Sequence, residues 1–150
     1  MFIKCEVTEL SNLGLMYPMK VLFVCTGNAC RSPLADALLK KFRPDIDVDS
    51  AGTYAYHKVV DITRRYAKQE GASEFLKTVP DSLESKKLND YDLIVAMETE
   101  HEQAILRQSP ECNDKVVVWH INDPYQLPYT QASHEFDKIK SKVAHLSKSL

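Results

Sequence analysis

The sequence predicts a three-layer α/β domain, in which a four-stranded parallel sheet is flanked by helices on both faces. Short apolar segments alternate with amphipathic segments about four times, the pattern of a parallel sheet with right-handed crossovers. The 150 residues are 44% hydrophobic and 27% charged, as expected for a globular domain with a sizeable core. Because no repeat, linker or low-complexity tract divides the chain, residues 19–150 are expected to form a single domain.

The first strand and the first helix are the clearest elements. Residues 21–24 are four apolar residues typical of a short buried strand. A turn-prone loop follows, in which Gly27 and Asn28 tolerate positive φ. Ser32 as a cap, with Pro33 in the first turn, predicts the start of a helix that runs to residue 42.

The remaining elements follow from periodicity, turn residues and caps. Alternating or continuous apolar residues predict strands at 46–51, 91–97 and 115–119. Helical periodicity predicts helices at 61–70, 98–108 and 134–150. The segment 75–88 is polar and irregular, with room for one short helix, and 121–133 is expected to be a long loop. Cys25, Gly52, Met97 and Trp119 then fall at the carboxyl ends of strands, where parallel sheets bind ligands.

Composition excludes several classes of function. A formal net charge of −2 does not indicate a nucleic-acid surface, and no apolar run approaches the length of a membrane span. Four cysteines are too few for a disulfide scaffold, and neither they nor the five histidines have the spacing of a metal site. No nucleic-acid or membrane partner is therefore expected, and the location is expected to be cytoplasmic.

Residues 1–18 precede the expected domain. Lys4, Glu6 and Glu9 interrupt their apolar residues, so the segment does not resemble a signal peptide. We expect an N-terminal extension outside the fold, either disordered or, over Met1–Val7, a β-like arm that docks on a sheet edge or a partner.

The loop between Cys25 and Arg31 carries the chemistry. A thiolate is the reactive form of cysteine, and a helix N-terminus, backbone N–H groups and an arginine all lower a thiol pKa. The same groups bind a tetrahedral anion, for which a guanidinium offers a matching fork. The Ser32 hydroxyl is expected to donate a hydrogen bond to the thiolate and so help it to leave. Taken singly these features are weak, because a cysteine that ends a buried strand is usually core. It is their combination that indicates a site.

A second residue completes a reaction. A thiolate that attacks phosphorus forms a phosphocysteine, and the departing oxygen then needs a proton from a general acid. Asp123, in a loop beyond the last strand and followed by Pro124, is the best candidate. It then serves as the base toward the water that hydrolyses the intermediate.

Residues 24–35, VCTGNACRSPLA, closely resemble the signature of low-molecular-weight protein tyrosine phosphatases. The resemblance continues through the segments 49–53, 91–97 and 123–125, in the family's order, and covers roughly residues 19–146. It implies a four-stranded parallel sheet, no metal and no cofactor, with phosphotyrosine proteins or peptides as substrates and inorganic phosphate as product and inhibitor.

The resemblance also assigns roles. Cys25 is implied as nucleophile, Arg31 as phosphate clamp and Asp123 as general acid and base. The resemblance implies that the phosphate-binding loop also includes Thr26, Gly27, Asn28, Ala29, Cys30 and Ser32, and that Ser50 supports it. Tyr56 and Tyr125 are implied as pocket walls, with Tyr54 and Tyr129 as further candidates. Cys30 is also implied as the partner of Cys25 in a reversible protective disulfide.

Three departures from the family pattern keep alternatives open. Ala29 is smaller than the residue usual in tyrosine phosphatases, so phosphoarginine is a possible substrate. The segment 77–88 lacks the histidine that often supports the phosphate loop, and residues 126–128 replace the usual glycines or second aromatic. A protein-arginine phosphatase is therefore one alternative function. An arsenate reductase on the same scaffold is a weaker alternative, because it needs further cysteines near the site and only Cys5 and Cys112 remain. A phosphate-binding module without catalysis is a third alternative. The joint presence of Cys25, Arg31 and Asp123 argues against it, because binding alone needs neither a thiol nor an acid.

Overall fold

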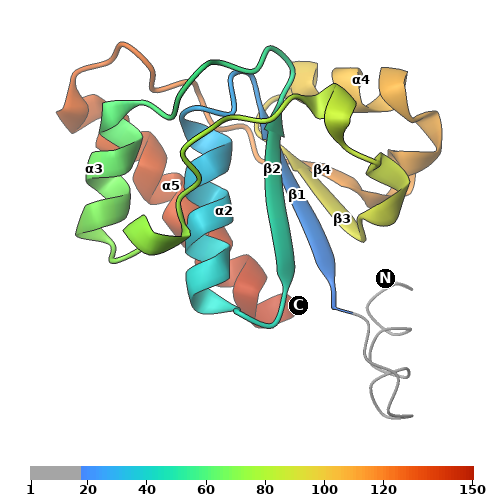
Figure 1. The fold of residues 1–150 in the computed structure, drawn as a ribbon, viewed down its shortest axis with the longest axis horizontal. Coiled ribbons are helices and arrows are strands. Elements are labelled where there is room, and N and C mark those ends of the chain that lie inside the picture. The colour runs from blue at the N-terminus through green and yellow to red at the C-terminus, as the bar shows by residue number, and fades with distance from the viewer. Residues whose placement is uncertain (1–17) are drawn as a thin grey trace.

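The computed structural model describes residues 18–150, whose centre is a four-stranded parallel sheet of order β2-β1-β3-β4 (Figure 1). The strands are β1 (Lys20–Cys25), β2 (Asp47–Gly52), β3 (Leu93–Ala96) and β4 (Val116–Val118). Every neighbouring pair is parallel. The predicted fold class is confirmed.

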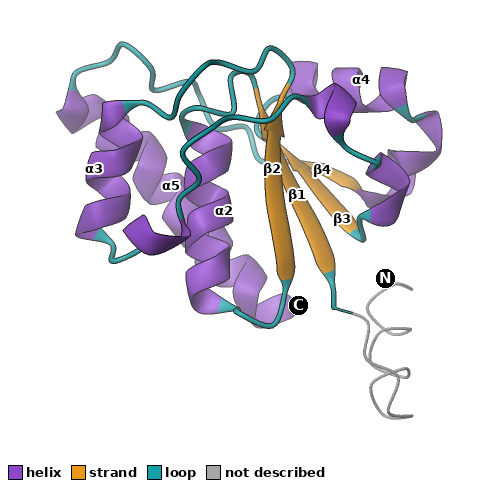
Figure 2. Ribbon diagram, viewed as in Figure 1, coloured by secondary structure: helices purple, strands orange, loops and turns teal. Residues whose placement is uncertain are grey.

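Helices cover both faces of this sheet and make three layers (Figure 2). On one face lie α2 (Arg31–Phe42), α3 (Asp61–Gln69) and α5 (Tyr129–Ser149), and on the other lies α4 (Thr99–Gln108). Four 3-10 turns complete the fold, η1 (Ser73–Phe75), η2 (Leu83–Ser85), η3 (Leu88–Asp90) and η4 (Pro110–Lys115). Residues 21–25 of β1 are all apolar because alternate side chains enter different cores: Phe23 packs on the α2 and α5 side and Leu22 on the α4 side.

Two helix starts differ from prediction. Helix α5 begins at Tyr129 rather than 134, because Pro128 sets an extended N-cap (φ −54°, ψ 146°) and buried Ala132 extends the apolar face by one turn. Helix α2 begins at Arg31, and Ser32 is not its cap: the N-cap position is Cys30, without a side-chain cap hydrogen bond. The Ser32 hydroxyl is instead used inside the site. Other boundaries lie within about two residues of prediction.

The carboxyl ends of the strands meet at one edge of the sheet, as predicted. Cys25 and Gly52 end β1 and β2 and are paired, and Met97 and Trp119 directly follow β3 and β4. The expectations for residues 1–18 fall almost wholly outside the described residues. Within residues 18–150, no helix has both the length and the apolar character that a bilayer crossing requires.

Candidate active site

The loop from Cys25 to Arg31 is held from outside by the segment 53–60. The carbonyl oxygens of Cys25, Thr26, Gly27 and Ala29 accept hydrogen bonds from backbone N–H groups of residues 53, 54, 56 and 60, at 2.8–3.1 Å. These bonds turn the loop carbonyls away from the pocket. The N–H groups of residues 27–30 have no acceptor among residues 18–150 and are available to an anion.

Backbone conformation and close packing shape the same loop. Asn28 has a positive φ of 49°, as predicted, whereas Gly27 does not. The second glycine that matters is Gly52 at the end of β2. A Cβ there would lie 2.5 Å from the Thr26 carbonyl oxygen and 2.7 Å from the Asn28 nitrogen. Strand β2 therefore touches the phosphate loop backbone to backbone, which requires glycine.

A chain of hydrogen bonds leads to the Cys25 sulfur. Asn28 Nδ2 donates to Ser32 Oγ at 2.8 Å, and Ser32 Oγ lies 2.9 Å from Cys25 Sγ. The Ser32 backbone N–H also points to this sulfur, at 3.4 Å. Because the Asn28 amide occupies a lone pair of the hydroxyl, the Ser32 proton is left to donate, and the Cys25 sulfur at 2.9 Å is a nearer acceptor than the Ala51 carbonyl at 3.5 Å.

Lys77 stands behind Asn28 and was not predicted. Its ammonium donates to Asn28 Oδ1 at 3.0 Å, to the Ser50 carbonyl at 2.9 Å and to Asp81 Oδ2 at 2.8 Å. The Asp81 backbone N–H also donates to Asn28 Oδ1, at 2.8 Å. Lys77 thus supports the loop in the segment where the family's histidine is missing, and it fixes which end of the Asn28 amide faces Ser32.

Ser50 is predicted as loop support. Its carbonyl accepts a hydrogen bond from Lys77, which in turn contacts Asn28, whereas its hydroxyl does not contact the loop directly. Its hydroxyl donates to Asp36 Oδ2 at 2.8 Å. Asp36 is buried in α2, and burial raises its pKa despite Lys40, whose ammonium lies 2.8 Å from Asp36 Oδ1. The contact anchors β2 on α2 beneath the loop.

Arg31 is 2% exposed and is oriented by two fixed acceptors. Its Nη1 donates to Glu98 Oε1 at 2.5 Å and to the Ile121 carbonyl at 2.7 Å. Burial opposes ionisation of Glu98, but the charge and the hydrogen bond of Arg31, together with a hydrogen bond from Glu100, outweigh it and hold the pKa of Glu98 below its ordinary value. Glu98 was also missed, although its place one residue after Met97, at a strand end, was a usable signal.

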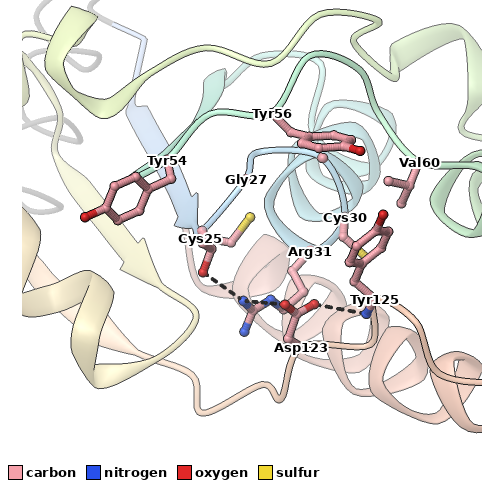
Figure 3. A pocket seen from close by; sticks show the side chains of 11 residues that line it. Cys25, Gly27, Cys30, Arg31, Tyr54, Tyr56, Val60, Asp123 and Tyr125 are labelled. Atoms are coloured by element: carbon pink, nitrogen blue, oxygen red, sulfur yellow. Dashed lines mark hydrogen bonds and ion pairs between the residues drawn. The ribbon is translucent and has the colours of Figure 1, made fainter.

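Asp123 lies over the guanidinium. Its Oδ2 is 3.9 Å from Arg31 Nη2, and its Oδ1 accepts the backbone N–H of Tyr125 at 3.0 Å (Figure 3). The carboxylate is half exposed. The structure therefore brings Asp123 to the site from a segment that is about a hundred residues away in the chain.

These residues enclose a pocket of about 190 Å³ (Figure 3). Tyr56 and Tyr125 stand at its mouth with ring centroids 6.4 Å apart and planes tilted by 56°. Tyr54 also lines the pocket but is 83% exposed, whereas Tyr129 stacks on Arg65 and does not line it. The lining is Cys25, Thr26, Gly27, Ala29, Cys30, Arg31, Tyr54, Tyr56, Val60, Asp123 and Tyr125.

Cys30 lines the pocket as a free thiol, as does Cys25. Burial and the neighbouring Cys25 raise the pKa of Cys30 to about 12, although a hydrogen bond with Thr63 acts in the opposite direction. Cys30 is therefore a protonated thiol at neutral pH. Within residues 18–150 no group of three or more histidine, cysteine, aspartate or glutamate side chains is placed to hold a metal.

Residues 20–150 match the family model for low molecular weight phosphotyrosine protein phosphatases. The low molecular weight protein-tyrosine-phosphatase Etp of Escherichia coli (strain K12) is 30% identical over 138 residues, covering 87% of this chain and 93% of Etp. Wzb of Vibrio vulnificus, solved in complex with benzylphosphonate, has a TM-score of 0.80 and 28% identity, over 88% of this chain and 99% of Wzb. The YwlE arginine phosphatase from Geobacillus stearothermophilus has a TM-score of 0.79 and 29% identity, over 88% and 92% of the two chains. The chain described here belongs to the low molecular weight phosphotyrosine protein phosphatase family.

Proposed function

We propose that this protein hydrolyses phosphotyrosine in proteins or peptides, with Cys25 as the nucleophile. The observation that carries the proposal is the position of the Cys25 sulfur. It lies at a strand end in a pocket that also contains loop N–H groups, a buried guanidinium and a carboxylate. Binding of phosphate alone would need neither the thiol nor the carboxylate.

The first step transfers the phosphoryl group to sulfur. The Cys25 thiolate attacks phosphorus, the bond to the tyrosine oxygen breaks, and protonated Asp123 gives its proton to that oxygen. Charge on the equatorial oxygens is stabilised by the loop N–H groups and by Arg31, whose direction Glu98 fixes.

The second step releases phosphate. Asp123, now a carboxylate, takes a proton from water, whose oxygen attacks phosphorus while the bond to Cys25 breaks. Ser32 donates its hydrogen bond to the departing thiolate. Inorganic phosphate is the product, and it inhibits because it fits the same anion site. A cytoplasmic location belongs to the same proposal, since the reaction needs a free thiol and reducing compartments keep thiols free.

Tyr56 and Tyr125 favour an aryl phosphate. An aromatic ring stacked between two others needs about 7 Å between the outer rings, and the centroids here are 6.4 Å apart. A modest opening of the half-exposed Tyr125 would admit a phosphotyrosine ring. The two phenol rings are the proposed walls, with specificity for a substrate whose phosphate stands on a flat group.

Phosphoarginine is a second candidate substrate. The small Ala29 side chain lines the pocket and leaves room beside the anion site. The likeness to an arginine phosphatase, given above, supports the same alternative.

The test is turnover of p-nitrophenyl phosphate and of matched phosphotyrosine, phosphoserine and phosphoarginine peptides, by the wild type and by C25S. We expect turnover that is abolished in C25S and highest for phosphotyrosine. Activity that survives in C25S would refute the enzyme proposal, and a preference for the phosphoarginine peptide would reassign the substrate.

A further inference from the structure

His101 is a buried side chain that the mechanism above does not use. It lies in the first turn of α4 and is fully buried. Its Nδ1 accepts the backbone N–H of Glu98 at 3.0 Å, and its Nε2 lies 2.9 Å from Thr26 Oγ1. The residue thus joins the start of α4 to the phosphate loop.

The two contacts fix the tautomer of His101. A backbone N–H can only donate, so Nδ1 must be unprotonated and the ring proton is on Nε2. Burial and the nearby Arg31 charge lower the pKa of His101 to about 4, so the ring is neutral at physiological pH. His101 therefore donates to the Thr26 hydroxyl oxygen and does not accept from it.

Thr26 then has a defined free proton. Its Oγ1 accepts from His101 and, at 3.5 Å, from Arg31 Nη2. Both are donors, so the hydroxyl proton must be given to a third group, and the described chain offers Thr26 no acceptor. The side chain lines the pocket together with Cys25 and Arg31.

We propose that the Thr26 hydroxyl donates a hydrogen bond to a phosphoryl oxygen of the bound substrate, and that His101 is the positioning residue that directs this proton into the pocket. The proposal rests on the proposed function. Ser32 already supplies a hydroxyl to the Cys25 sulfur, so an unprotonated phosphoryl oxygen, which can only accept, is the partner that suits Thr26. The loop would then bind phosphate through a hydroxyl donor in addition to its backbone N–H groups and the Arg31 guanidinium.

The first test replaces the hydroxyl alone. In T26V the shape of Thr26 is kept and the proton is lost, whereas T26S keeps the proton. Loss of a hydrogen bond to a charged group is expected to lower a binding or rate constant by about tenfold or more. We expect kcat/KM for p-nitrophenyl phosphate to fall about tenfold in T26V and the inhibition constant of inorganic phosphate to rise by a similar factor. T26S should stay within about threefold of the wild type.

The second test asks whether His101 acts through Thr26. H101Q keeps an acceptor for the Glu98 N–H, because glutamine is a natural partner in this capping position. We expect H101Q to lower kcat/KM severalfold when Thr26 is present and to have no further effect in T26V. Melting temperatures of the wild type, T26V, H101Q and the double variant show whether each protein is folded. If H101Q does not fold, the comparison of T26V with T26S still tests the role of the Thr26 hydroxyl.

The outcomes separate the two proposals. Loss of wild-type turnover in C25S establishes the enzyme first, and turnover that persists in C25S refutes the proposed function. With C25S inactive, a T26V protein with unchanged kcat/KM and unchanged phosphate inhibition overturns only the role of Thr26. An H101Q effect of equal size in both backgrounds overturns the role of His101.

Discussion

Gly52→Ala tests how strand β2 shapes the phosphate loop. The added Cβ would lie 2.5 Å from the Thr26 oxygen, 2.7 Å from the Asn28 nitrogen and 2.8 Å from the Gly27 carbon, all backbone atoms. Gly52 is also held from behind, because its N–H donates to the Asp81 carbonyl at 2.9 Å. The loop must therefore retreat by about 0.9 Å or more, because ordinary van der Waals contact with a Cβ begins at 3.4 Å. A displacement of that order in a catalytic loop costs about 10²-fold in rate, and overpacking costs about 1–3 kcal/mol of stability.

We expect G52A to lose about two orders of magnitude in kcat/KM for p-nitrophenyl phosphate and several degrees in Tm. Gly71→Ala is the matched control. It makes the same chemical change at a positive φ of 68°, at the end of α3 and against the Lys41 side chain. G71A should lose about 1 kcal/mol of stability with kcat/KM unchanged. The reasoning is refuted if G52A, folded and with normal Tm, keeps kcat/KM within threefold of the wild type.

The other expected outcomes concern four residues around the loop. Lys77→Met should lower kcat about tenfold and the free energy of unfolding by about 1–3 kcal/mol, since Asn28 Oδ1 loses a charged donor; kinetics and urea unfolding test both, and an unchanged kcat would contradict it. Asp123→Asn should slow esters with poor leaving groups far more than those with good ones, and equal losses across a series of aryl phosphates would remove Asp123 from the acid role. Between pH 6.5 and 4 the unfolded state binds more protons than buried His101 does, so stability should fall with acid by about 3 kcal/mol more in the wild type than in H101Q; parallel pH dependences would argue otherwise. After peroxide treatment, thiol should restore the wild type but not Cys30→Ser, and full recovery of the variant would exclude a protective disulfide.

The sequence predicted what is contiguous along the chain. Cys25, Arg31 and Ser32 belong to one strand–loop–helix unit, so their residue types and spacing already indicate an anion site. Asp123 was reached by a chemical argument, because a phosphocysteine mechanism requires an acid and a strand-end loop provides one. The sheet was predicted for similar reasons, since buried parallel strands are short apolar runs.

What the sequence did not predict depends on contacts between distant segments. Lys77 lies between α3 and β3 in a stretch with no periodicity, and only the fold places its ammonium against Asn28. His101 occupies an ordinary helical position, and its value comes from a hydrogen bond to Thr26 across the sheet edge. The early start of α5 was missed because its first turn, which directly follows the N-cap Pro128, carries little of the apolar pattern that becomes clear from Phe136.

The hydrogen bonds between the segment 53–60 and the phosphate loop restrict how this enzyme can diversify. The backbone that carries Tyr56 is tied to the loop carbonyls bond by bond, so an insertion or deletion there would disturb the anion site itself. The loop that carries Asp123 and Tyr125 has no backbone bond of this kind to residues 25–31 within the described chain. New substrate preferences should therefore arise on the Tyr56 wall by exchange of side chains alone. On the Tyr125 wall they should arise by changes in both the length and the sequence of the loop.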